Sequence, residues 1–106
     1  MAKLIFVLYK RQDMSADEFR SYWKETHAEL AKKVPGARKY LQNHAVSDPE
    51  GEAPPYSGVA ELVFDSPEEM KQGLESEEAQ AAIADLPNFT NESRMEVAVV
   101  EEVSIA

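Results

Sequence analysis

The N-terminal half of the chain passes from a continuous apolar run to a stretch in which apolar residues recur with helical spacing. Residues 3–10 are β-branched and aromatic between flanking charges, which predicts a buried strand. Ser15, with Glu18 three residues later, predicts a helix N-terminus closed by a capping box. A Pro-Gly pair at residues 35–36 ends this helix, and a second strand is expected over residues 38–46.

The apolar stripe of this helix predicts which side chains face the sheet. At about 100° per residue, one side of the helix collects a set of apolar or β-branched residues. These residues are Phe19, Trp23, Thr26, Leu30 and Val34. His27 falls at the edge of the stripe, about 80° from Phe19. We therefore expect His27 to touch the sheet while staying close to an opening.

The second half of the chain repeats the pattern with shorter helices. A loop rich in proline and acids is expected at residues 47–55, followed by a third strand at 57–64. Ser66 and Ser76 each precede a pair of glutamates in the next few residues, as helix N-caps do, which predicts two short helices. A fourth strand is expected over residues 94–103.

The resulting order, β-α-β-β-α-β, predicts a ferredoxin-like α+β fold in one domain, residues 1–106, with a four-stranded antiparallel sheet and its helices on one face. The strands are apolar on both sides: Ile5 and Val7 oppose Phe6 and Leu8 on the first. One helical layer leaves the other apolar face in water, at a cost of about 25 cal/mol per Å². We therefore expect a homodimer packed sheet to sheet.

Composition narrows the classes of partner. The 106 residues carry a formal net charge of −9, which argues against a nucleic-acid partner, because nucleic acids require a clustered basic surface. The absence of cysteine excludes disulfides, thiolate metal sites and a cysteine nucleophile. No apolar run approaches the length that spans a bilayer, and the first residues lack the pattern of a signal peptide. We expect a cytoplasmic protein without a membrane partner.

Candidate chemistry gathers on the first helix and the second strand, which hold both histidines and the single tryptophan. The period of two places Tyr40, Gln42 and His44 on one face of the strand. If that face meets the helices, His27, Tyr40 and His44 share a cavity. His27 would be the acid or base, Tyr40 the donor to developing negative charge, and His44 an accessory contact.

The same residues also have plainer explanations. A histidine at the margin of an apolar stripe is often only a boundary residue, and a strand tyrosine often only packs. No metal site and no cofactor are expected, because two histidines without carboxylates at ligand spacing form no recognisable motif. Further ligand contacts are expected from four other positions, one of them a tryptophan that the core would also explain: Trp23, Gln42, Phe6 and Leu62.

Several segments carry a family resemblance across almost the whole chain. They are residues 14–19, 22–28, 34–36, 40–44 and 54–62. Together these segments resemble the EthD family, named after a small protein associated with ethyl tert-butyl ether degradation. The resemblance implies a dimeric α+β barrel and leaves the activity open.

The chain is also similar to the methylmuconolactone isomerases of the wider dimeric-barrel group, which use no cofactor. That resemblance implies a functional histidine at His27 and a functional tyrosine at Tyr40. The isomerase cysteine position is occupied here by Leu62, and the second histidine position by Ala53, so the specific isomerisation is not implied. Haem-binding relatives ligate haem through a histidine on another element, and the C-terminal half here has none.

The sequence leaves three functions open. The first is a cofactor-independent acid/base enzyme acting on a small apolar or aromatic carbonyl compound, by isomerisation, decarboxylation or a related reaction, in degradative or secondary metabolism. The second is an oxidoreductase or cofactor-free monooxygenase of the same fold. The third is a ligand-binding or accessory protein without chemistry. Substrate identity, and whether loop 47–55 closes over a ligand, are not specified by the sequence.

Overall fold

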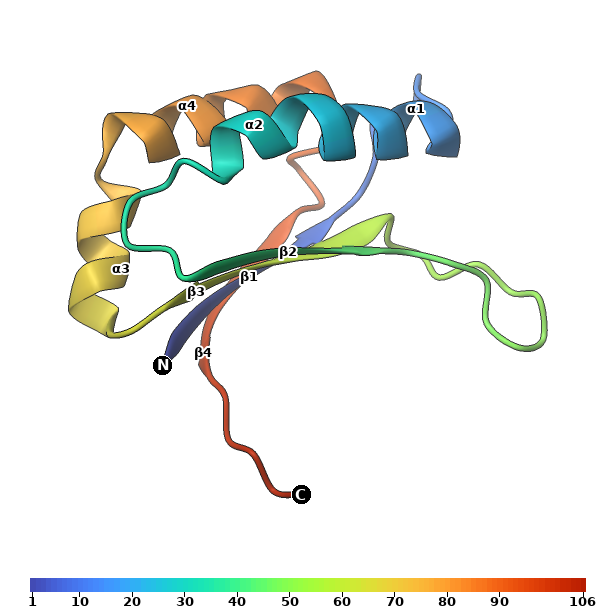
Figure 1. Cartoon of the computed structure of the whole chain (residues 1–106). Coiled ribbons are helices and arrows are strands. Elements are labelled where there is room, and N and C mark those ends of the chain that lie inside the picture. The colour runs from blue at the N-terminus through green and yellow to red at the C-terminus, as the bar shows by residue number, and fades with distance from the viewer.

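One antiparallel sheet forms the centre of the computed structural model, which describes residues 1–106 (Figure 1). Its strands lie in the order β2-β3-β1-β4. Their bounds are β1 Ala2–Leu8, β2 Lys39–His44, β3 Gly58–Phe64 and β4 Glu96–Glu101. All the α-helices lie on one face of the sheet. The predicted ferredoxin-like α+β order is therefore confirmed.

The first helical segment begins where the sequence predicts. The Ser15 hydroxyl accepts from the Glu18 backbone N–H at 3.0 Å, and the Glu18 carboxylate accepts from the Ser15 N–H at 2.9 Å, which completes the capping box. The segment then changes winding twice. It runs through α1 (Ala16–Ser21), the π-helix η1 (Tyr22–His27) and α2 (Ala28–Ala31). The π-helical turn was not predicted.

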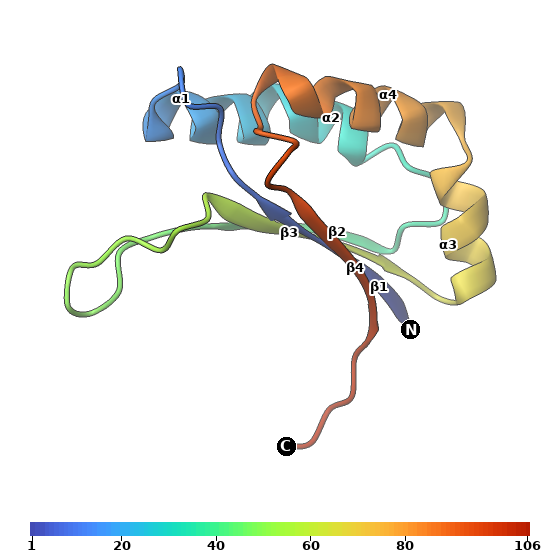
Figure 2. The same ribbon diagram turned by 180° about the vertical axis from the view of Figure 1, so that it is seen from behind.

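The second helical segment consists of two short helices, as expected. They are α3 (Pro67–Leu74) and α4 (Glu77–Asp85), followed by the 3-10 turn η2 (Leu86–Asn88). The hydroxyls of Ser66 and Ser76 cap α3 and α4. In Figure 2, α3 stands at one end of the sheet and α4 runs alongside α2 over it. No helix of the chain is long and apolar enough to cross a membrane.

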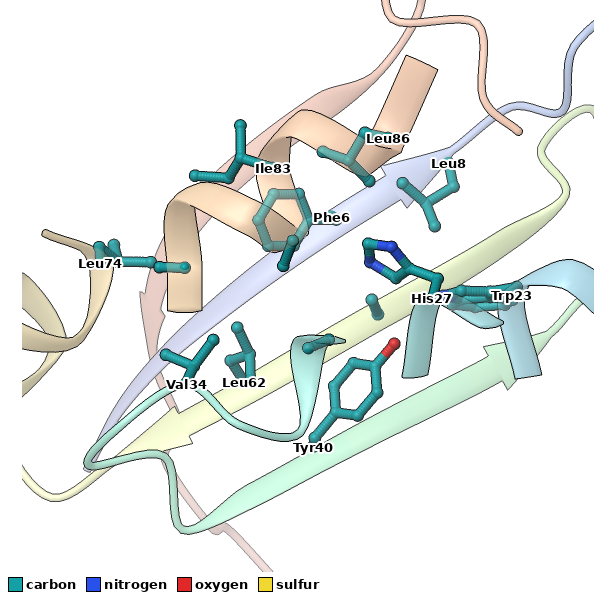
Figure 3. Close-up of a pocket in the computed structure, with 14 residues that line it drawn as sticks. Phe6, Leu8, Trp23, His27, Val34, Tyr40, Leu62, Leu74, Ile83 and Leu86 are labelled. Atoms are coloured by element: carbon teal, nitrogen blue, oxygen red, sulfur yellow. The ribbon is translucent and has the colours of Figure 1, made fainter. Parts of the chain in front are cut away.

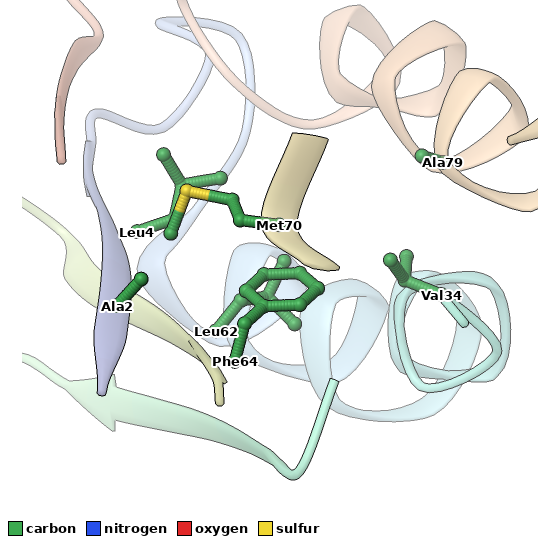
Figure 4. Close-up of a cluster of buried hydrophobic side chains, with 7 residues drawn as sticks. All are labelled: Ala2, Leu4, Val34, Leu62, Phe64, Met70 and Ala79. Atoms are coloured by element: carbon green, nitrogen blue, oxygen red, sulfur yellow. The ribbon is translucent and has the colours of Figure 1, made fainter. Parts of the chain in front are cut away.

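The core fills the space between this helical layer and the sheet. Side chains alternate along β1 and β3, so that Leu4 pairs with Leu62 and Phe6 with Ala60 on the covered face. One buried cluster lies beneath α3 and the end of α2 (Figure 4). It contains Ala2, Leu4, Val34, Leu62, Phe64, Met70 and Ala79. The other cluster lies beneath α1 and η1, and contains Leu8, Phe19, Trp23, Ala60, Leu86 and Phe89.

The opposite face of the sheet, which we call the open face, carries no helix (Figures 1 and 2). Its apolar side chains alternate with those of the covered face, and are Ile5, Val7, Leu41, Val59, Val63, Ala98 and Val100. Lys3 on this face pairs with two carboxylates. The Lys3 ammonium lies 3.0 Å from the Glu61 carboxylate and 2.6 Å from that of Glu102.

Candidate functional site

A small apolar cavity lies between the covered face of the sheet and the helices (Figure 3). Its volume is about 40 Å³, and its walls are hydrophobic except at His27 and at the polar tips of Tyr40 and Trp23. Engineered cavities that admit benzene are larger, at about 150 Å³. An aromatic ligand therefore requires the side chains to move apart. Ile83, which lines the cavity and is 42% exposed, marks where the cavity approaches the surface.

The π-helical turn determines where His27 points. A π-turn holds more residues than an α-turn, because its hydrogen bonds run from residue i+5 to residue i. The Ala28 N–H accordingly bonds the Trp23 carbonyl. Each residue advances by less than 100°, so His27 rotates back toward the line of Phe19. It is 6% exposed and packs against the Phe89 ring at 4.8 Å.

Two expectations about this helix are therefore wrong. Thr26 was expected in the buried stripe and is exposed, while His27 is buried rather than at the edge. The side chains that the π-turn brings into the stripe after Trp23 are His27 and, one turn later, Ala31. Straight α-helical spacing was the source of both errors.

Asp85, at the end of α4, is the partner of His27. Asp85 Oδ2 lies 2.9 Å from His27 Nδ1, and its other oxygen accepts from the Tyr22 hydroxyl at 2.6 Å. The Asn88 amide donates to the same oxygen at 2.9 Å. The buried Asp85 carboxylate therefore has three partners, and Tyr22 and Asn88 hold it against the imidazole. His27 Nε2 makes no hydrogen bond to the protein.

Sequence reasoning missed Asp85, Tyr22 and Asn88. A signal for Asp85 was present, since it follows Ala79 and Ala82 at three-residue spacing on the buried side of α4. An acidic residue on an apolar helical stripe needs a partner, because a buried charge without one is costly. Nothing in the spacing of the other two residues pointed to this role.

The protonation states of the pair follow from their surroundings. Burial lowers the pKa of His27 below its ordinary 6.5, and the opposing effect of Asp85 does not reverse the shift. Burial raises the pKa of Asp85, but hydrogen bonds from Tyr22, Asn88 and His27 outweigh it and hold the pKa below 3.8. At neutral pH the pair is a carboxylate and a neutral imidazole. Nδ1 then carries the proton donated to Asp85, and Nε2 is left unprotonated.

Tyr40 lies on the covered face of β2 and lines the same cavity (Figure 3). Its oxygen accepts from the Gln42 amide at 2.8 Å, and its own hydroxyl proton has no acceptor in the protein. Burial raises the pKa of Tyr40 above 10.0, although Gln42 and Trp23 oppose the shift. The phenol therefore stays protonated and can donate a hydrogen bond.

The remaining expected ligand contacts divide into two groups. Phe6, Leu62 and Trp23 line the cavity. Gln42 does not, but its amide donates to both Tyr40 Oη and the Trp23 carbonyl, the latter at 2.9 Å. His44 also lies outside: its ring packs against Trp23 at 4.5 Å, and its Nε2 lies 2.9 Å from Gln42 Oε1. The structure thus brings His27 and Tyr40 into one cavity and separates His44 from them.

No cluster of three or more histidine, aspartate or glutamate side chains is placed to hold a metal ion. The lining residues whose side chains carry a polar atom are His27, Tyr40 and Trp23. Together they offer one proton acceptor and two hydrogen-bond donors in apolar surroundings.

Comparison with solved structures supports the fold. A protein from Bacillus halodurans C-125, described as an ethyl tert-butyl ether degradation (EthD) family protein, is 25% identical with a TM-score of 0.81, covering 97% of this chain and 100% of that one. A Bacteroides fragilis protein, described as dimeric with a ferredoxin-like fold, is 19% identical with a TM-score of 0.68 and 95% coverage of both chains. SnoaB from Streptomyces nogalater, described as a cofactor-independent oxygenase, is 14% identical with a TM-score of 0.66, covering 98% of this chain and 94% of that one.

Comparison by sequence gives the family. No curated protein sequence matches the chain. The model of the EthD domain matches residues 11–93, which include the whole of the first helical segment and the strands β2 and β3. The protein belongs to the EthD family.

Proposed function

We propose that the protein is a cofactor-independent acid/base enzyme acting on a small apolar or aromatic carbonyl compound. The observation that carries the proposal is the His27–Asp85 pair, 2.9 Å apart, on the wall of an apolar cavity that Tyr40 also lines. A buried, oriented and neutral imidazole is suited to accept a proton near neutral pH. Membership of the EthD family and the similarity to SnoaB, described as a cofactor-independent oxygenase, support this proposal.

In the proposed reaction, His27, Tyr40 and Asp85 each have one role. His27 Nε2 removes a proton from the carbon beside the carbonyl group, and the C–H electron pair moves to the carbonyl oxygen as an enolate. The Tyr40 hydroxyl donates a hydrogen bond to that oxygen, where the negative charge develops. The imidazolium then returns the proton to another atom of the substrate, which completes an isomerisation. Asp85 is a positioning residue that fixes the tautomer and stabilises the imidazolium.

The substrate class follows from the walls of the cavity. Apolar side chains surround the polar tips, so the body of the substrate is expected to be aliphatic or aromatic and uncharged. A charged substituent would be buried without a partner. The cavity of about 40 Å³ also requires widening on binding, which favours small compounds.

The test is a turnover screen of lactones, quinones and polyketide-like phenols with the wild type, His27→Gln and His44→Gln. We expect His27→Gln to lower kcat by about 10²- to 10⁴-fold, the usual contribution of general acid–base catalysis. His44→Gln is the matched control, because its ring lies outside the cavity. Full activity in His27→Gln would overturn the proposal.

The other two functions predict different results in the same screen. Oxygen consumption coupled to turnover would favour a cofactor-free monooxygenase, as the similarity to SnoaB makes worth testing. Ligand binding without conversion would favour an accessory or binding protein. Binding without conversion counts against proton transfer by His27, and oxygen consumption counts against isomerisation as the reaction.

We also propose that two copies associate through the open face. The similar Bacteroides fragilis protein is described as dimeric. On this chain the open face carries a row of apolar side chains on adjacent strands, with Val7 opposite Val59, and no helix of the same copy covers them. A second sheet is of the right shape to remove them from water.

A further inference from the structure

We propose that the indole N–H of Trp23 is a second hydrogen-bond donor to the reacting oxygen of the substrate, beside the Tyr40 hydroxyl. This rests on the proposed function and narrows its substrate class. The favoured substrates are those whose oxygen gains a full negative charge during reaction, as in enolate or phenolate formation. A lone neutral carbonyl needs only one donor, whereas an oxyanion accepts two or more.

The first support is that the Trp23 N–H is buried without a partner. Trp23 is 0% exposed, and its Nε1 is a fully buried side-chain donor that makes no hydrogen bond. Buried donors are almost always paired in folded proteins, so an orphan donor calls for an explanation. A ligand atom that accepts from it in the cavity supplies one, since Trp23 lines that cavity.

The second support is that the indole cannot turn to find another acceptor. The far edge of its six-membered ring occupies the space above Gly58, where a Cβ would overlap it. The His44 ring packs at 4.5 Å and the Phe19 ring at 5.5 Å. The Gln42 amide holds the Trp23 backbone carbonyl. A donor fixed in this way gives up no conformational freedom when an oxyanion forms.

The third support is convergence with Tyr40. Trp23 and Tyr40 both line the cavity, and the indole N–H makes no hydrogen bond to the Tyr40 hydroxyl. The Tyr40 oxygen is already held by Gln42, so its proton is free to point elsewhere. Two donors from different elements, η1 and β2, therefore meet at one wall of the cavity that also contains His27 (Figure 3).

The single tryptophan gives a direct readout. The ¹H–¹⁵N spectrum of the full chain contains one indole resonance, which reports Trp23 without any substitution. The probe is 4-nitrophenol at a pH where it is ionised, as a mimic of an enolate. We expect a downfield shift of the indole proton on titration. The matched control, 4-nitroanisole, has the same ring without the oxyanion and is expected to leave the resonance unchanged.

Variants give the second measurement. Trp23→Phe removes the N–H, and Tyr40→Phe removes the hydroxyl. We expect each to weaken 4-nitrophenolate binding about 10- to 100-fold, as the loss of one hydrogen bond to a charged group implies. Tyr56→Phe removes a hydroxyl outside the cavity and is the control expected to retain binding. The spectra of the variants serve as the check that they are folded.

Two results would overturn the inference. One is an indole resonance that does not move with 4-nitrophenolate; the other is an equal shift with 4-nitroanisole. Neither would touch the role of His27, which the turnover screen tests separately. Conversely, a clear indole shift with no turnover of any compound would leave an oxyanion-binding site and refute proton transfer.

Discussion

The two faces of the sheet are built from the same strands and are both apolar, yet their polar groups differ in whether they have partners within the protein. On the covered face, His27, Tyr40 and Trp23 direct polar atoms into one cavity, and His27 Nε2 and the Trp23 N–H have no protein partner. On the open face, the Lys3 ammonium is paired with the carboxylates of Glu61 and Glu102. Unsatisfied groups on one face favour ligand chemistry, and self-paired groups on the other favour association.

The largest expected effect is a difference in the free energy of unfolding between a leucine substitution on the covered face and one on the open face. Leu4 on the covered face is 4% exposed, and Leu41 on the open face is 44% exposed. We expect Leu4→Ala to lower the free energy of unfolding by about 2–5 kcal/mol. In dilute protein, where copies are separate, Leu41→Ala is expected to cost less than about 1 kcal/mol. Urea unfolding measures both, and equal losses in dilute protein would erase the distinction.

The next effect concerns association through the open face. Val59→Asp places a carboxylate among apolar side chains of the proposed interface, where burying it without a partner costs several kcal/mol. We expect the dimer dissociation constant to rise at least about 100-fold. Val46→Asp adds the same charge at a residue that is 69% exposed beyond the end of β2, and is expected to leave assembly unchanged. Light scattering across a dilution series distinguishes them, and an unaffected Val59→Asp dimer would place the interface elsewhere.

The smallest expected effect is the response of the covered face to acid. Burial lowers the pKa of His27 in the folded state, so the unfolded chain binds a proton more readily. The stabilisation from neutral His27 is complete above about pH 6.5 and is lost as the pH falls below it. Unfolding midpoints between about pH 7.5 and 5.5 measure this slope.

Matched variants isolate the His27 contribution from that of the other groups. His27→Gln cannot titrate and is expected to show a flatter pH dependence. His44 also has a lowered pKa, through burial and the nearby Arg20 and Lys24, and contributes with the same sign. His44→Gln is therefore the control, expected to retain the steeper part of the slope. Identical slopes in the wild type and His27→Gln would refute the assignment.

The fold was largely predictable because its signals are local. Ser15, Ser66 and Ser76 each cap a helix at the predicted position. Gly36 adopts a φ of 82° in the turn before β2, whereas α2 already ends at Ala31 with Lys32 as its C-cap. Strand alternation also grouped Tyr40, Gln42 and His44 on one face of β2, and left open which face meets the helices. These features depend on residues within a few positions of each other, so the sequence contains them directly.

The site was only half predictable, because its decisive contacts are not local. Asp85 lies 58 residues from His27, and no local pattern pairs them. The separation of His44 from the cavity depends on the position of the Trp23 ring, which in turn depends on the space above Gly58. The π-helical turn escaped prediction because residues 22–27 have no spacing that distinguishes it from an α-helix.

The π-helical turn has a consequence for how this scaffold could diversify. Removing one exposed residue, such as Lys24, would let the segment wind as an ordinary α-helix while α1 and α2 kept their positions on the sheet. Because His27 directly precedes α2, it would keep nearly its present place beneath α4. The π-helical turn thus accommodates one extra residue on the exposed side of the segment, so that the length of this segment can vary while the imidazole stays in the cavity wall.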